Sequence, residues 1–170
     1  AARREGVNAL YLAMEDIRRI REITFPLSSK WLPDPTVQVT GISAGTVHNV
    51  VPGTCRYVID VRSNDQYDNE TILKLIECRT SAKLMPRSIR LTSSKINDEN
   101  ILFQVIDQLK LTPFGSPTLS DMALLPFPAV KMGPGHSERS HGPDEYLTEQ
   151  ELWDGIHGYE QFLYTLNEGK

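Results

Sequence analysis

Residues 55–62 alternate between apolar and polar side chains, and this period of two restricts the fold more than any other feature of the chain. Successive side chains of a strand point to opposite faces, so the alternation predicts a strand with one buried and one solvated face. The residues of the predicted buried face are Cys55, Tyr57, Ile59 and Val61. Residues 36–43 alternate in the same way, with Val37 and Val39 on one face. Residues 44–53 connect the two stretches and are too many for a tight hairpin turn, so we predict antiparallel pairing across a long connection.

Apolar residues at helical spacing flank this predicted pair of strands. Residues 6–22 form one predicted helix, and Asp68 or Asn69 caps a second. Residues 84–92 are predicted as a further strand, at a sheet edge because Pro86 has no backbone N–H to donate. The predicted buried stripes are Val7, Leu10, Tyr11, Met14, Ile17 and Ile20 on the first helix, and Ile72, Leu75 and Ile76 on the second. The order predicts an α+β fold of one antiparallel sheet and two helices, which a strand ahead of the first helix would complete to a ferredoxin-like pattern.

The composition changes after this part of the chain, where a polar and charged stretch begins. A helix is predicted over residues 101–109, and a stretch rich in Pro and Gly follows it, with one short strand at 130–132. Thr-Glu-Gln-Glu at 148–151 is typical of a capping box and predicts the start of a last helix. We therefore predict two domains, residues 1–92 and residues 93–170.

Charge and hydropathy exclude two classes of partner. The 170 residues hold 18 Lys and Arg against 22 Asp and Glu, a net charge of −4, so we expect no basic face for nucleic acid. The longest uncharged apolar run, at 122–130, is far shorter than the roughly 20 residues of a membrane span. The 2 cysteines make no disulfide framework and no apolar signal region is present, so we expect a cytoplasmic protein.

Spacing alone leaves the histidines ambiguous. His136 and His141 share a loop with Glu138, Asp144 and Glu145, and all five belong to residue types that bind metal ions. The same loop is also typical of a polar surface, and no His-x-x-x-His or Cys-x-x-Cys spacing identifies a metal site.

Three further polar residues, Arg62, Ser120 and Asp121, are candidates for function that also have an ordinary structural interpretation. Arg62 ends the predicted strand on its polar face, where a guanidinium holds either a carboxylate ligand or a surface ion-pair partner. Ser120 and Asp121 precede an apolar run, where Asp121 is also a candidate helix cap. The sequence has no Gly-x-Ser-x-Gly elbow, phosphate-binding loop or dinucleotide fingerprint, so spacing specifies no reaction.

Four segments, in order along the chain, resemble signatures of the di-zinc amidohydrolases, a family that includes acetylornithine deacetylase, succinyl-diaminopimelate desuccinylase, aminoacylase and related carboxypeptidases. The segments are 6–9, 44–62, 116–121 and 133–145, and the third is typical of the acetylornithine deacetylase branch. The resemblance implies that residues 1–92 are a ferredoxin-like lid and dimerisation domain without its first strand. It implies that residues 93–170 are the last part of a zinc-peptidase-like α/β catalytic domain.

The resemblance also implies roles for five residues. His141 matches a histidine that binds one of two zinc ions, for which cobalt can substitute. Asn49 and Arg62 match lid positions that hold the carboxylate of the substrate, Asn49 from across the dimer. Ser120 and Asp121 match the rim of the catalytic domain near that carboxylate. The implied partners are a small N-acyl amino acid and a second copy of the chain, bound through the lid.

The remaining metal ligands and the general base of the family stand ahead of its lid and have no match in these 170 residues. We therefore expect the chain to be the C-terminal half of an enzyme, with no catalytic residue of its own and no activity alone. The intact enzyme is expected to deacylate N-acetylornithine or an N-succinyl analogue through a zinc-activated water, in arginine biosynthesis. Two alternatives stay open: a stand-alone dimerisation or binding module, and a dipeptidase or carboxypeptidase of the same family.

Overall fold

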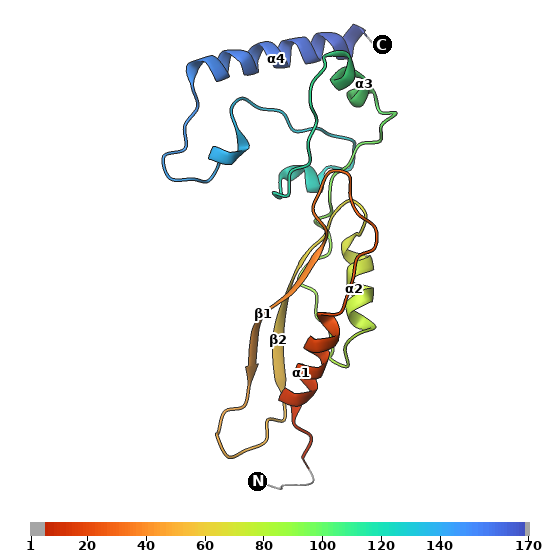
Figure 1. Cartoon of the computed structure of the whole chain (residues 1–170), viewed down its shortest axis with the longest axis vertical. Coiled ribbons are helices and arrows are strands. Elements are labelled where there is room, and N and C mark those ends of the chain that lie inside the picture. The colour runs from red at the N-terminus through yellow and green to blue at the C-terminus, as the bar shows by residue number, and fades with distance from the viewer. Residues whose placement is uncertain (1–5, 169–170) are drawn as a thin grey trace. The chain divides into compact units, whose positions relative to one another are not determined.

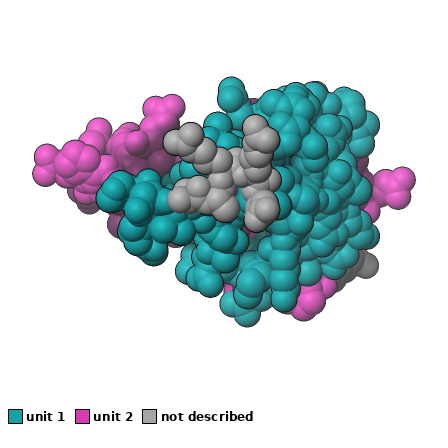
Figure 2. Space-filling view, turned by 90° about the horizontal axis from the view of Figure 1, so that it is seen from below, with its two compact units in different colours: residues 1–93, 116–118 teal, residues 94–115, 119–170 magenta. Residues whose placement is uncertain are grey.

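The structure of the chain is a computed structural model that describes residues 6–168. These residues form two compact units, which Figure 2 draws in different colours. The first unit holds the described residues up to 93 together with 116–118, and the second holds 94–115 and the described residues from 119 onward. None of the helices in the described part of the chain has the length and apolarity that crossing a membrane demands.

The first unit contains two helices and two strands in the predicted order. They are α1 (Ala9–Ile20), β1 (Thr36–Ala44), β2 (Cys55–Arg62) and α2 (Asn69–Glu77). The Asn8 side chain accepts from the backbone N–H of Leu10 at 3.0 Å and caps α1. Asp68 accepts from the N–H of Thr71 at 2.7 Å and caps α2, as one of the two predicted caps. Each cap satisfies a backbone donor that has no partner inside its own helix.

Strands β1 and β2 pair antiparallel, which confirms the predicted pairing and the α+β class. Val37 lies opposite Val61 and Val39 opposite Ile59, so apolar side chains meet across the ladder on one face. The register shifts between Val39 and Gly41, where one extra residue forms a bulge. Both helices cover the same face of this sheet (Figure 1).

The core of the first unit lies between that face and the two helices. Its buried members come from both helices and from the segment that leads into α2: Ile20, Tyr67, Ile72 and Ile76. Val37, Tyr57, Ile59 and Val61 pack against them from the sheet. The period of two therefore identified the buried face of the sheet correctly.

The predicted buried stripe of α1 is wrong on one flank. Tyr11 is 68% exposed and Met14 57% exposed, whereas Ala13 and Asp16 are buried. Asp16 is inside because it accepts hydrogen bonds from the chain after α2, including the backbone N–H of Ser81 at 3.0 Å. Four donors satisfy this carboxylate, and α1 is turned so that Asp16 faces them.

The predicted strand at residues 84–92 is also wrong. This segment is irregular, and the sheet of the described residues has two strands. The Asn69 side chain donates to the carbonyls of Ile89 at 3.2 Å and Leu91 at 2.7 Å, so an amide takes the place of a neighbouring strand. A strand needs a ladder partner, and sequence alternation does not supply one.

The second unit contains α3 (Ile101–Gln108), the short 3₁₀ helices η1 (Asp121–Leu124) and η2 (Ser137–Arg139), and α4 (Glu149–Glu168). Val105 and Ile106 of α3 pack against Phe162 of α4, with further apolar side chains around them. The two predicted helices are confirmed, and the capping box of α4 forms as expected: the N–H of Glu151 donates to Thr148 Oγ1 at 3.2 Å. The N–H of Thr148 donates back to Glu151 Oε2 at 2.9 Å.

The short strand predicted at 130–132 does not form. Val130 and Met132 instead pack against the α3–α4 cluster. The backbone carbonyl of Met132 accepts from the Tyr159 hydroxyl at 2.7 Å, so a helix side chain satisfies this backbone group.

Candidate functional site

His141 lies at the third position of a tight turn in the second unit. The N–H of Gly142 donates to the carbonyl of Arg139 at 3.3 Å and closes the turn. Ser140 has φ −67° and ψ 136°, and His141 has φ 62°, which together describe a type II turn. A residue with a Cβ costs roughly 1 kcal/mol in this left-handed conformation, where glycine is usual. Lys110 and Asp144 are left-handed as well, so the conformation makes His141 a candidate for a functional position and does not by itself assign its role.

Polar contacts around the turn hold its backbone. The N–H of His141 donates to Glu145 Oε2 at 3.1 Å. Asp144, one residue before Glu145, is also left-handed, with φ 59°. The imidazole of His141 belongs to an exposed residue, so it can reach a ligand outside the unit.

A bidentate ion pair links this turn to the start of α4. Arg139 Nη1 and Nη2 each lie 2.8 Å from a carboxylate oxygen of Glu151. The guanidinium also lies over the Tyr146 ring, 4.4 Å from its centroid. The Arg139 guanidinium and the N–H of Thr148 lower the pKa of Glu151 to about 2. The sequence identified Glu151 through the capping box, but no local pattern pointed to Arg139 as its partner.

Two positions of the Gly-Pro-Gly motif that precedes the turn, Pro134 and Gly135, are sterically constrained, whereas a Cβ on Gly133 would meet nothing within 4 Å. Gly135 has φ 79°, and a Cβ on it would lie 2.9 Å from Leu147 Cδ1. A Cβ on Gly155 of α4 would lie 2.8 Å from the Cβ of Pro134, so the helix and the motif approach too closely for a larger residue.

One imidazole fits a single position in a zinc site. A catalytic zinc takes three protein ligands and a structural zinc four. No group of three or more His, Cys, Asp or Glu side chains within residues 6–168 is arranged to hold a metal ion. The second loop histidine, His136, instead has its Nε2 3.6 Å from Glu151 Oε1.

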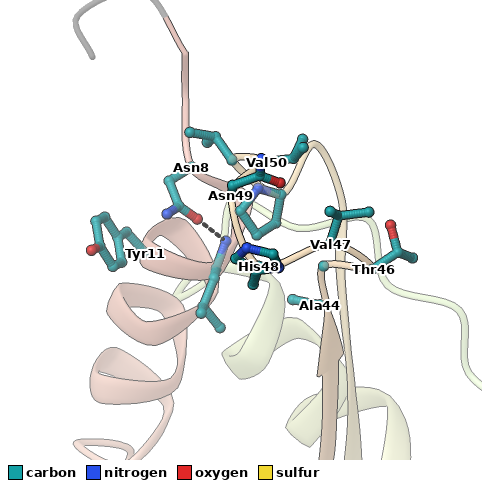
Figure 3. Close-up of a pocket in the computed structure, with 12 residues that line it drawn as sticks. Asn8, Tyr11, Ala44, Thr46, Val47, His48, Asn49 and Val50 are labelled. Atoms are coloured by element: carbon teal, nitrogen blue, oxygen red, sulfur yellow. Dashed lines mark hydrogen bonds between the residues drawn. The ribbon is translucent and has the colours of Figure 1, made fainter. Parts of the chain in front are cut away.

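Asn49 lies in the first unit, on the long connection between β1 and β2. This loop and the start of α1 line an open pocket of about 610 Å³, to which Asn8, Tyr11 and His48 also contribute (Figure 3). The loop turns at Gly45, whose φ is 73°, and the carbonyl of Pro52 accepts from the N–H at the start of α1 at 3.0 Å. Asn49 itself is exposed.

Arg62 lies at the opposite end of the same strand pair. It is the last residue of β2, its side chain is 74% exposed, and its Nε lies 2.8 Å from Asp60 Oδ2. Cys55 begins β2 next to the loop of Asn49, and at a rise of about 3.3 Å per residue the ends of this strand lie roughly 23 Å apart. One copy of the chain therefore does not bring Asn49 and Arg62 together.

Ser120 and Asp121 lie where an irregular stretch of the second unit enters η1. Asp121 is the first residue of this 3₁₀ helix and Ser120 holds the cap position, so the alternative interpretation of Asp121 as a helix cap is wrong. The cap is made by backbone alone, because the Ser120 carbonyl accepts from the N–H of Ala123 at 3.0 Å. The Asp121 carboxylate is exposed.

Comparison with known proteins agrees with the resemblance seen in the sequence. A family model described as a peptidase dimerisation domain, of the M20 type, matches residues 1–87. The acetylornithine deacetylase of Vibrio vulnificus (strain CMCP6) is 26% identical over 162 residues, which cover 84% of this chain and 42% of the relative. A peptidase M20 domain-containing protein of Schizosaccharomyces pombe is 24% identical over 161 residues, which cover 94% of this chain and 38% of the relative.

The chain spans about two fifths of the length of these two relatives. The family match covers the unit in which the predicted strand pair and two helices were found. The chain therefore belongs to the M20 peptidase family, and its first unit corresponds to the peptidase dimerisation domain of that family.

Proposed function

We propose that this chain forms the lid and the C-terminal catalytic segment of a metal-dependent amidohydrolase, with the boundary after residue 92. Its substrate would be an N-acyl amino acid, with N-acetylornithine or an N-succinyl analogue as first choice, in arginine biosynthesis. The observation that carries the proposal is the exposed His141, held in a left-handed conformation at the tip of an ordered turn. The 26% identity to a relative named acetylornithine deacetylase supports the choice of substrate.

His141 would hold one position on a zinc ion, and cobalt would serve in its place. A bound zinc polarises the amide carbonyl and lowers the pKa of a bound water to near neutrality. The other ligands, and with them the general base, would come from outside residues 6–168, since no three or more His, Cys, Asp or Glu side chains of this part of the chain are arranged to hold a metal ion. The role of the chain is then to present one ligand and to hold the substrate.

Arg62 and Asn49 would hold the substrate carboxylate from two copies of the chain. A guanidinium holds a carboxylate bidentately, and the Arg62 side chain is 74% exposed. The length of β2 between the two residues supports a site that takes Asn49 from the partner of a homodimer. Ser120 and Asp121 would lie at the rim of the same site.

The first unit offers a surface for such a homodimer. Tyr11 and Met14 of α1 have large apolar side chains that are more than half exposed. Apolar side chains gathered on one exposed helix face mark interaction surfaces. The match to a peptidase dimerisation domain supports the same reading.

Helix α4 of the second unit exposes several large apolar side chains. Leu152, Trp153, Ile156 and Leu163 of α4 are each between 41% and 61% exposed. We propose that the rest of the catalytic domain covers this face.

The free thiols of Cys55 and Cys78 suit a reducing compartment, and we propose the cytoplasm.

The experiment compares the 170-residue chain with the longest form of the protein that its gene encodes. Both are supplied with zinc or cobalt and tested on N-acetyl amino acids, N-succinyl amino acids and dipeptides. The 170-residue chain should hydrolyse none of them. Hydrolysis by this chain alone would refute the proposal that the other metal ligands and the general base come from outside it. In the longest form, His141→Ala should lower both metal content and activity, whereas His157→Ala, an exposed histidine of α4, should leave the metal content unchanged.

A stand-alone dimerisation module is the second candidate. It is favoured by one observation, that the matched family model covers residues 1–87 alone. A chain that forms stable dimers indifferent to zinc and to His141→Ala, and that hydrolyses no substrate in any form, would support the module. Preference for dipeptides over N-acyl amino acids would instead identify a dipeptidase or carboxypeptidase.

A further inference from the structure

We propose that the ion pair between Arg139 and Glu151 is a positioning device that fixes the turn carrying His141 relative to α4. Neither residue would touch substrate or metal. The inference deepens the proposed function and rests on it, since it takes His141 as the metal ligand that has to be held.

Arg139 is linked to the turn and to the helix at once. Its backbone carbonyl is the acceptor that closes the turn, at 3.3 Å from the N–H of Gly142. Its side chain makes two parallel bonds of 2.8 Å to Glu151. The ion pair therefore restrains the turn against movement away from α4, and the fixed fork of arginine makes that bidentate geometry specific.

Glu151 is itself held in place before Arg139 reaches it. Thr148 donates to Glu151 Oε2 through its N–H at 2.9 Å and its hydroxyl at 2.8 Å. The carboxylate is thus part of the N-terminal cap of α4, a fixed point of a 20-residue helix. The side chains of Arg139 and Glu151 are 24% and 19% exposed, far less than those of the pairs on α1, so solvent screens this pair less.

The turn has a physical need for such a link. His141 occupies a left-handed conformation that its Cβ disfavours, and a turn under strain persists only when its surroundings hold it. Residues that orient a metal ligand without touching the metal commonly change metal affinity by about 10–100-fold. The Arg139–Glu151 pair is the contact that joins the strained turn to a helix.

The test measures amide hydrogen exchange by NMR in the 170-residue chain, where no metal is needed. Arg139→Met removes the ion pair and keeps an apolar stem over Tyr146. The matched control is Arg19→Met, which removes an arginine from an exposed ion pair with Glu15 on α1. We expect the Gly142 amide to exchange about tenfold faster or more in Arg139→Met, which loses both charge-assisted hydrogen bonds, and to be unchanged in Arg19→Met.

The distribution of the effect separates positioning from general stability. If the pair positions the turn, faster exchange stays within residues 139–145, and the amides of Val105 and Phe162 in the core of the unit keep their rates. Glu151→Gln should reproduce the effect with α4 intact, because glutamine also completes a capping box. Unchanged exchange at Gly142 in Arg139→Met, or an equal rise throughout the unit, would overturn the inference.

Metal binding in the longest form of the protein separates this inference from the function on which it rests. We expect Arg139→Met to weaken cobalt binding, measured against a competing chelator, by about 10–100-fold. If His141→Ala leaves the metal content unchanged, the proposed function fails, and with it the purpose assigned to the pair. If His141→Ala removes metal but Arg139→Met does not weaken its binding, the function stands and the positioning role is refuted.

Discussion

Replacing Asp16 should destabilise the first unit more than any surface change on the same helix. The side chain is 2% exposed and lies on α1, whereas its hydrogen-bond donors lie on β2 and after α2. It accepts from the N–H of Ser81 at 3.0 Å, the N–H of Ala82 at 3.2 Å and the Tyr57 hydroxyl at 3.2 Å. One carboxylate thus joins three parts of the unit.

The magnitude follows from the donors that Asp16→Ala would leave without an acceptor. A buried donor without a partner costs about 1–3 kcal/mol. Ser81 and Ala82 are exposed, so water reaches their N–H groups once the carboxylate is gone. We therefore expect a loss of about 2–4 kcal/mol in the free energy of unfolding, rather than the sum over all donors. Asp16→Asn keeps one acceptor oxygen and should lose about half as much.

Urea unfolding followed by tryptophan fluorescence measures this loss. The chain has 2 tryptophans, and a Trp153→Phe background leaves Trp31 as the reporter of the first unit. Glu15→Gln is the matched control, since Glu15 makes only exposed ion pairs on α1, which contribute about 0–1 kcal/mol. If Asp16→Ala unfolds at the same urea concentration as Glu15→Gln, the buried carboxylate does not hold the unit together and the reasoning is wrong.

Three further predictions concern local features. Gly155→Ala should destabilise the second unit by about 1–3 kcal/mol, because its new Cβ would lie 2.8 Å from the Cβ of Pro134. Gly158→Ala would place its Cβ in open space, with nothing within 4 Å, and should stabilise α4 by about 0.5–1 kcal/mol. Urea unfolding followed by the fluorescence of Trp153 distinguishes the two variants. Burial and the adjacent Asp16 carboxylate raise the pKa of Tyr57 to about 12 from an ordinary 10.0, so the folded state holds this proton more tightly. The resulting stability is complete below pH 10 and is lost as the pH rises towards 12, and Tyr57→Phe should remove this part of the alkaline decline in a pH series of unfolding curves. Asp68→Ala should lower the free energy of unfolding of the first unit through loss of the α2 cap. Because the N–H of Thr71 lowers the pKa of Asp68, this stability is present above the ordinary value of 3.8 and is lost as the pH falls below it, so equal acid unfolding of wild type and variant would contradict the prediction.

Local patterns predicted the elements whose causes are local. The alternation at 55–62 identified β2 and its buried face, and the capping box at 148–151 identified the start of α4. Both depend on residues within one turn or one strand of each other, so short-range spacing carries the information. The predicted strand at 84–92 failed because Asn69 accommodates its carbonyls, and that contact joins residues 20 and 22 positions apart.

The candidate site also combines features that the sequence predicted with features that depend on contacts between distant residues. Resemblance to a family singled out His141, Asn49, Arg62, Ser120 and Asp121, and the match to the M20 dimerisation domain supports the family itself. The left-handed conformation of His141 and its link through Arg139 to Glu151 were not visible in the sequence. Twelve positions separate the two members of that pair, and no helical or strand period relates them.

The amino-acid sequence alone was thus sufficient for the α+β class, the antiparallel strand pair and the capping box of α4, because propensity, periodicity and capping act between near neighbours. The resemblance of four ordered segments was sufficient for the family. Tertiary structure decided which flank of α1 faces the core, where Asp16 finds its donors, and how the His141 turn is held. These features depend on which distant groups meet, and the hydrogen bonds and packing that select them exist only once the chain has folded.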